Sequence, residues 1–399
     1  MINHPINTNL INFTQFNPIE LSQKLIRIPS YSGLNLEVIK LLQDILQPLN
    51  FSCQTQNYSG DNSYEVNNLH AIYQVEKNLP TLYFAGHSDV VKEGDKNAWQ
   101  FPPFAGEIVD QKLYGRGASD MKCAIACFVS AVAEFLKDNP KPKFAIGFLI
   151  TNDEESDGVN GTNKVLQWMK QNNLPIDYCL VGEPTNPSKF GEMIKIGRRG
   201  SVGFKLTIEG KQGHVAYPHN ALNPITILIN VLKILKDHKL DNGNEFFDPS
   251  NLEITSINSP NLGGNVITGL AEANFNIRFN DIHNSKSIVE WVEYVCSKSI
   301  GSITNYQLTN RVSGEAFLSQ PKKLANLVSQ AVYEICKIEP VLSTTGGTSD
   351  ARFIKNYAQE VIEIGLVNET AHKIDEYSKL SEIEQLQKVY LKILNLFNQ

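Results

Sequence analysis

The stretch TLYFAGHSDVV, residues 81–91, joins an apolar run to a histidine and an aspartate. Its first part, TLYFAG, contains aromatic and β-branched residues and predicts a buried strand. Side chains alternate along a strand, so His87 and Asp89 should leave the same face. A carboxylate beside an imidazole can orient a metal-binding histidine. Alternatively, His87 is a strand-end histidine that hydrogen-bonds to a nearby acid.

Predicted strands and helices alternate on both sides of this stretch. The N-terminal helix should begin at Pro18, with Asn17 as its cap and Glu20 in its first turn. This alternation predicts an α/β fold whose central sheet is mixed, largely parallel and flanked by helices. The further strands are expected at 68–75, 143–151 and 177–182, and the further helices at 35–46, 121–136 and around 159–170.

The pattern changes between residues 200 and 312. The sequence there predicts a compact α+β domain with an antiparallel sheet, inserted into the larger domain. The expected boundaries are therefore 1–199 and 313–399 for the larger domain and 200–312 for the insertion. The inserted strands are expected at 201–210, 251–257 and 272–280 with helices at 221–238 and 285–299, and the α/β pattern resumes with a helix at 322–337, a strand at 359–365 and a C-terminal helix.

Composition excludes several classes of protein. The chain has 399 residues, of which 42% are hydrophobic and 20% charged, as in globular proteins with more than one core. A net charge of −6 without a basic stretch argues against nucleic acid as a partner. No run approaches the roughly 18 apolar residues of a membrane span, so no membrane partner is expected. The Asn-rich residues 1–18 read as a short extension and not a signal peptide. The six cysteines lie mostly in apolar segments and indicate free thiols in a reducing cytoplasm.

Acidic and histidine side chains recur where the predicted parallel strands end. In open α/β sheets ligands bind at the carboxyl ends of the strands, so these side chains should converge on one rim. Two histidines with several carboxylates suit a divalent metal such as zinc, and the surplus of carboxylates favours two metals with one bridging ligand. The residues concerned are His87, Asp120, Glu154, Glu155, Glu183 and His372.

Each of these residues also has a simpler interpretation. Asp120 could cap a helix that begins at Met121. The run DEES could be a solvated turn, which is the usual place of clustered charges. Glu183 and His372 could be ordinary loop and surface residues. A metal site explains all of them together, whereas the simpler interpretations need a separate reason for each.

Seven short segments connect the chain to a known family. In order they are HSDVV (87–91), GRGASDMK (115–122), TNDEES (151–156), GEP (182–184), GRRGSVGF (197–204), GHVAYPH (213–219) and TGGTSDARF (345–353). From about residue 17 to its end, the chain resembles the di-zinc amidohydrolases that include aminoacylases, acetylornithine deacetylase and glutamate carboxypeptidases. The resemblance implies a zinc-peptidase-like catalytic domain and an inserted lid and dimerisation domain. It further implies a homodimer that hydrolyses the amide of a small-molecule substrate.

The resemblance also implies a role for each residue of the rim. His87 and Glu183 would hold one zinc ion, and Glu155 and His372 would hold the other, with cobalt possible at one of the two sites. Asp120 would bridge the two ions. Asp89 would orient His87, and Glu154 would be the general base.

Further residues match the family's substrate-binding positions. His214 would reach into the partner subunit's site and stabilise the oxyanion, although the sequence alone allows a solvated loop histidine. A bidentate guanidinium suits a carboxylate, as expected for the two arginines of this group. The positions that would hold carboxylate and amide groups of the substrate are Arg198, Tyr217, Asn265, Arg278, Thr348 and Asn368.

Two alternatives stay open at this point. Pocket shape decides the acyl group, so the chain could be an acetylornithine deacetylase, a related deacylase or a dipeptidase. It could also be a catalytically silent binding protein on the same fold. Such a protein would be expected to lose ligands, whereas all five implied ligands and Glu154 are present.

Overall fold

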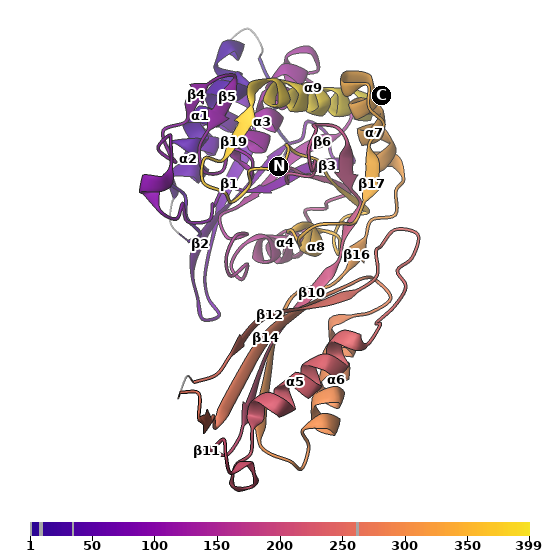
Figure 1. Ribbon diagram of the computed structural model, residues 1–399. Coiled ribbons are helices and arrows are strands. Elements are labelled where there is room, and N and C mark those ends of the chain that lie inside the picture. The colour runs from indigo at the N-terminus through magenta and orange to yellow at the C-terminus, as the bar shows by residue number, and fades with distance from the viewer. Residues whose placement is uncertain (1, 8–10, 34–35, 261–262) are drawn as a thin grey trace. The chain divides into compact units, whose positions relative to one another are not determined.

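The computed structural model describes residues 2–7, 11–33, 36–260 and 263–399. The chain forms two compact units (Figure 1). The first comprises Met1–Ile196, Ser319–Ser343 and Ser349–Gln399, and the second comprises Gly197–Leu318 and Thr344–Thr348. Across the described ranges, no helix combines the length and apolar character needed to cross a membrane.

A mixed sheet forms the centre of the first unit. Its four inner strands, β6, β3, β7 and β18, run parallel to one another, and antiparallel pairs occur at β1–β2, β2–β6 and β18–β8. The predicted α/β fold with a largely parallel sheet is thus confirmed. Among the described residues the strand order is β1 (Ser52–Gly60), β2 (Ser63–Tyr73), β6 (Ala145–Thr151), β3 (Thr81–His87), β7 (Tyr178–Val181), β18 (Glu360–Glu363), β8 (Met193–Lys195) and β17 (Val341–Ser343).

Helices lie on both faces of this sheet. Figure 1 shows α3 and α9 on one face and α4 and α8 on the other. The Asn17 side chain accepts from the N–H groups of Ile19 and Glu20, as predicted for the first helix. Of the predicted helix 35–46, residue Asn35 lies outside the described residues. The helices are α1 (Pro18–Ile26), α2 (Leu36–Leu46), α3 (Lys122–Asp138), α4 (Thr162–Gln171), α7 (Lys323–Cys336), α8 (Ala351–Ile354) and α9 (Leu380–Phe397), with short 3₁₀ turns at Phe13–Phe16, Gln47–Leu49 and Lys96–Ala98.

Aromatic packing holds β3 in the centre of the first unit. Phe84 stacks on Phe128 of α3 with ring centroids 4.5 Å apart, and Tyr390 of α9 lies edge-on to both rings. Strand β3 is almost entirely buried, as its continuous apolar run predicts. This packing fixes the position of His87, which is the last residue of the strand.

A small sheet joins two distant parts of the first unit. Its order is β19 (Tyr377–Lys379), β5 (Lys112–Tyr114) and β4 (Glu107–Val109). Tyr377 pairs with Tyr114 in antiparallel register. The segment just after β5 and the segment just before β19 are therefore neighbours.

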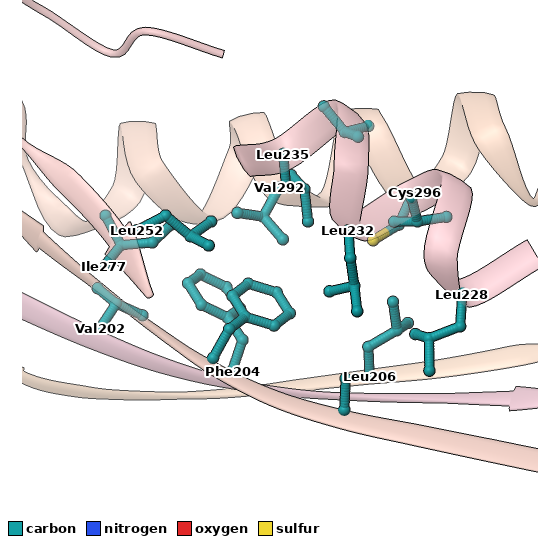
Figure 2. Packing of buried hydrophobic residues seen from close by; sticks show 14 of the residues in the cluster. Val202, Phe204, Leu206, Leu228, Leu232, Leu235, Leu252, Ile277, Val292 and Cys296 are labelled. Carbon is teal, nitrogen blue, oxygen red and sulfur yellow. The ribbon is translucent and has the colours of Figure 1, made fainter. Parts of the chain in front are cut away.

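The second unit contains an antiparallel sheet covered on one face by two helices. Figure 2 shows the side chains of β10 and β14 packed against those of α5 and α6. Along β10 the residues Val202, Phe204, Leu206 and Ile208 are buried, as strand alternation requires. The sheet order is β12 (Asn251–Asn258), β14 (Leu270–Phe279), β10 (Gly200–Glu209) and β15 (Tyr306–Gly314), and the helices are α5 (Pro224–Asp237) and α6 (Ser285–Ser299).

Among the described residues of the second unit, two short strand pairs and one 3₁₀ turn accompany this sheet. Strand β9 (Gly197–Arg198) pairs with β16 (Phe317–Leu318), and β11 (Gly213–His214) pairs with β13 (Val266–Ile267). The turn at Pro218–Asn220 follows β11. All six cysteines of the chain are free thiols, and four of them are fully buried.

Candidate metal centre

His87 ends the buried strand β3 with its ring almost wholly enclosed, at 1% exposure. Its Nδ1 atom lies 2.9 Å from the main-chain oxygen of Asp89. Because a carbonyl only accepts, Nδ1 donates to it, and Nε2 is the ring atom that could bind a metal. Nε2 lies 2.9 Å from Asp120 Oδ1 and 3.7 Å from Glu183 Oε1. Nε2 of His87 and the carboxylates of Asp120 and Glu183 therefore converge on one point, where they could share a metal ion.

Asp120 does not cap the following helix. Helix α3 begins at Lys122, and its cap residue Met121 provides no side-chain hydrogen bond. The Asp120 carboxylate instead faces two histidines, with Oδ1 on His87 and Oδ2 at 3.3 Å from His372 Nε2. A carboxylate whose two oxygens face different histidines has the arrangement of a bridging ligand.

His372 and Glu155 form the outer side of the same cluster. His372 Nε2 lies 2.8 Å from Glu155 Oε1, although the histidine is 49% exposed. Its backbone has a φ of +64°, in the left-handed region that favours glycine. Glu155 is 9% exposed, so this part of the DEES run does not lie in a solvated turn.

Asp89 contacts the site through both its main chain and its side chain. Its main-chain oxygen holds the His87 ring, while its carboxylate lies 3.7 Å from Nδ1 of that ring. The carboxylate accepts from the backbone N–H groups of Glu154 and Glu155, at 3.0–3.2 Å, and from the Ser32 hydroxyl at 2.7 Å. The buried Asp89 side chain thus fixes the turn that carries both glutamates.

Glu154 projects into the site beside Glu155. Its carboxylate is 13% exposed and lies 3.9 Å from the Arg352 guanidinium. Potential ligand atoms fall into two groups in which all members lie within 4.8 Å of one another. The first group is His87, Asp120 and Glu155, and the second is His87, Glu154 and Glu183.

The pKa values at the site reflect an excess of carboxylates. Burial raises the pKa of Glu154 to about 8. Burial alone would lower the pKa of His87, but the hydrogen bond to Asp120 and the nearby carboxylates raise it well above 6.5. Hydrogen bonds to Asp120 and Glu155 raise the pKa of His372 to about 10. A divalent cation among these groups would offset their mutual repulsion, so the donor set fits a metal.

Some predicted substrate-binding residues lie near the start of β10 in the second unit. Arg198 is buried, and its Nη1 donates to the main-chain oxygen of Gly347, next to Thr348. Arg278 pairs with Ser201 across the sheet, and its buried Nη1 has no hydrogen-bond partner among the described residues. Burial, with the nearby charge of Arg199, lowers the pKa of Arg278. These groups suit an anionic ligand.

Three other predicted residues lie together beyond the far end of β10. His214 and Tyr217 have ring centroids 5.7 Å apart, and the N–H of Val215 donates to the main-chain oxygen of Asn265. All three predicted residues are exposed. Asn368 lies in the first unit, where it is also exposed and its N–H donates to the main-chain oxygen of Asn186.

Three residues that contact the site have no role predicted from the sequence. Ser32 bonds to Asp89, Arg352 lies beside Glu154, and Glu376 accepts from the N–H of Asp120 at 3.1 Å. Arg352 belongs to the segment TGGTSDARF, and Glu376 follows His372 by four residues, so position within a motif was the available signal.

Comparisons with known proteins agree with this fold. The family model Peptidase family M20/M25/M40 matches residues 83–396. The chain is 47% identical to the succinyl-diaminopimelate desuccinylase of Pelagibacter ubique, over 95% of this chain and 98% of that one.

Two solved structures of M20 family proteins are similar in fold. A metallo-carboxypeptidase from Sulfolobus solfataricus matches with a TM-score of 0.77 at 15% identity, over 96% of this chain and 99% of that one. A Bacillus subtilis protein described as a dinuclear metal binding peptidase matches with a TM-score of 0.67 at 14% identity, over 97% of this chain and 98% of that one. The family model and the desuccinylase relative agree with the resemblance seen in the sequence, and the chain belongs to peptidase family M20/M25/M40.

Proposed function

We propose that the chain is a succinyl-diaminopimelate desuccinylase, which hydrolyses N-succinyl-L,L-2,6-diaminopimelate to succinate and L,L-2,6-diaminopimelate. The observation that carries this function is the 47% identity to a desuccinylase over almost the whole of both chains. The product is a precursor of lysine and peptidoglycan. A cytoplasmic location follows from this biosynthetic role and agrees with six free cysteines.

Two zinc ions per chain are part of the proposal, with cobalt possible at one site. His87 and Glu183 would hold one ion, Glu155 and His372 the other, and Asp120 both. The support is geometric, because the two oxygens of Asp120 face different histidines and each histidine also lies near one further carboxylate. Bound zinc supplies Lewis acidity, which polarises the amide carbonyl and lowers the pKa of a nearby water.

Glu154 is the proposed general base. It takes a proton from the attacking water as the water oxygen bonds to the amide carbon. The carbon–nitrogen bond then breaks, and Glu154 returns the proton to the leaving amine. Asp89 holds the Glu154 main chain during both transfers. Arg352, at 3.9 Å from Glu154, stabilises its carboxylate before the first transfer and after the second.

The substrate's charges fit the second unit. Succinyl-diaminopimelate carries carboxylates at both ends, and guanidinium groups are the natural partners for them. Arg278 has a buried Nη1 without a hydrogen-bond partner among the described residues, which favours an anionic ligand there. Arg198 and Thr348, in the same unit, are assigned to the same substrate.

A homodimer explains the position of His214. Arg278 pairs with Ser201 at the start of β10, whereas His214 follows the end of that strand at Glu209. At about 3.3 Å per residue, the strand from Ser201 to Glu209 spans roughly 26 Å. One small substrate cannot reach both ends, so His214, with Tyr217 and Asn265, is proposed to serve the site of a partner subunit.

A substrate panel with zinc-loaded protein tests the proposed function. N-succinyl-L,L-diaminopimelate should have a kcat/KM several orders of magnitude above those of N-acetylornithine and simple acyl amino acids, because buried guanidinium groups penalise a ligand that lacks their partners. The Glu154→Gln variant is the control for background hydrolysis. Equal or faster turnover of N-acetylornithine would refute the substrate while leaving the amide chemistry intact.

A further inference from the structure

We propose that the buried pair Glu376–Arg116 is the positioning element that fixes Asp120 and His372 relative to each other. The proposal rests on the proposed function in one respect, because it takes Asp120 and His372 as metal ligands. Neither residue of the pair is itself a ligand or touches Glu154. Their role is to hold together two chain segments, 115–120 and 372–376, that are far apart in the sequence.

Glu376 holds the main chain on which Asp120 stands. Its Oε1 accepts from the N–H of Ser119 at 2.8 Å and from the N–H of Asp120 at 3.1 Å. Its own main-chain oxygen accepts from the N–H of Gly115 at 2.9 Å. One residue thus binds both ends of the segment 115–120, and the direction of the Asp120 carboxylate depends on it.

Arg116 connects this arrangement to the other histidine segment. Its Nη1 donates to Glu376 Oε2 at 2.7 Å, and its Nη2 donates to the main-chain oxygen of His372 at 3.4 Å. The same guanidinium lies over the Trp99 ring, 5.2 Å from its centroid. Arg116 therefore links the main chain of His372, a proposed ligand, to Glu376, which positions the proposed bridging ligand Asp120.

Burial makes this pair more than a surface contact. Glu376 is 0% and Arg116 is 2% exposed, so each charge depends on the other for stabilisation. The 115–120 segment has further contacts with residues on either side of 372–376, since Ser119 Oγ donates to the main chain of Val367 and Ser378 Oγ to that of Ala118. These bonds are neutral and involve neither the N–H nor the carboxylate of Asp120, whereas Glu376 accepts directly from that N–H, so the direction of Asp120 is assigned to the ion pair.

The chain offers a matched control in Glu360. This residue is also a buried glutamate that accepts from backbone N–H groups, at 2.8–2.9 Å, from Lys322, Leu324 and Ala325. It stands at the start of β18, whereas the site lies beyond the carboxyl ends of the strands. Glu360→Gln and Glu376→Gln therefore remove the same charge from similar environments, and only the second adjoins proposed ligands.

The test measures zinc dissociation constants by competition with a chromogenic chelator, together with thermal unfolding of the metal-free proteins and kcat and KM. Substitution of groups that orient metal ligands typically weakens binding about 10–100-fold. Glu376→Gln should show a loss of this size and a lower kcat with little change in KM. Glu360→Gln should lower the unfolding temperature but keep the zinc affinity and kcat of the wild type.

A second variant keeps the test decisive if Glu376→Gln does not fold. Arg116→Lys retains a cation beside Glu376 but cannot also reach the main-chain oxygen of His372, so it should weaken zinc binding by a smaller factor. Wild-type zinc affinity in both folded variants, or in Arg116→Lys alone when Glu376→Gln is unfolded, would overturn the proposal. Wild-type protein that binds zinc but rejects the substrate would refute the proposed substrate and leave this inference standing.

Discussion

In the first unit, the proposed ligands and base lie at the carboxyl edge of a sheet with helices on both faces, and hydrogen bonds fix most of them. In the second unit, His214, Tyr217 and Asn265 lie on exposed connections beyond an antiparallel sheet. His87 is 1% exposed, whereas Tyr217 is 59% exposed. Both regions contain a histidine with a proposed role in the reaction, but His87 is buried and His214 is exposed.

This difference separates two tasks. The first unit by itself brings together the candidate metal ligands and the proposed base, which is what bond cleavage needs. Among the described residues, the exposed residues of the second unit belong to neither group of potential ligands, and they fit a role in which substrate or a partner subunit completes the contacts. Substitutions in the first unit should therefore change metal content or chemistry, and those in the second unit should change turnover or substrate affinity while zinc is retained.

The largest effect should come from Glu154→Gln, which keeps the shape of the side chain but cannot accept a proton. We expect kcat to fall about 10²–10⁴-fold, the usual worth of a general base, while two zinc ions stay bound. Glu155→Gln is the matched variant and should lose zinc from the site it shares with His372. The opposite pattern, with zinc lost from Glu154→Gln and kept by Glu155→Gln, would reverse the roles of the two neighbours.

The second effect concerns His214 and tests whether the second unit serves another chain. His214→Ala should lower kcat about 10²–10³-fold with zinc content unchanged, as for loss of an oxyanion donor. Refolding it in equal amounts with Glu154→Gln should restore about a quarter of wild-type activity, because half of the dimers then contain one intact site. Mixed dimers without this recovery would place His214 in the site of its own chain.

A smaller effect is expected from Arg278→Lys. The ammonium of lysine keeps the charge but cannot make two parallel bonds to a carboxylate. We expect KM for succinyl-diaminopimelate to rise roughly tenfold or more, the worth of one hydrogen bond to a charged group, with little change in kcat. Lys205→Arg, on the polar face of the same sheet, is the control. An unchanged KM would remove Arg278 from the substrate-binding set.

The smallest effect is a pH dependence of the metal-free protein. Burial raises the pKa of Glu154 from its ordinary 4.5 to about 8. Because the folded pKa is the higher one, the folded state binds the extra proton, and the stability this brings is present below pH 4.5 and lost as the pH rises towards 8. The free energy of unfolding should therefore fall less steeply with pH in metal-free Glu154→Gln than in the wild type. Parallel curves in denaturant titrations would contradict the shift.

Much of the fold could be predicted because local signals were clear. The helix expected at 285–299 has the same bounds as α6, where Asn284 and Ser287 form a capping box. The strands β1 and β15 were not predicted. Both are edge strands with mostly exposed or half-buried residues, so they lack the apolar pattern by which a strand is recognised.

The site could be predicted only in part, for a related reason. Parallel strands end on one edge, so the residues after β3, β6 and β7 could be brought together from the sequence. The contacts of Asp89 with the Glu154–Glu155 turn, and of Glu376 with Asp120, use backbone N–H groups. Such groups occur at every residue except proline, so they leave no pattern of residue types. Glu376 also joins Asp120 across 256 residues of sequence.

The proposed chemistry requires two metals held by the first unit and bridged by Asp120. The most direct measurement is anomalous diffraction at the zinc edge from crystals of zinc-loaded Glu154→Gln protein. We predict two peaks about 3.5–4 Å apart, one beside His87 and Glu183 and the other beside His372 and Glu155, with Asp120 between them. A single peak, or two peaks that do not share Asp120, would contradict the account.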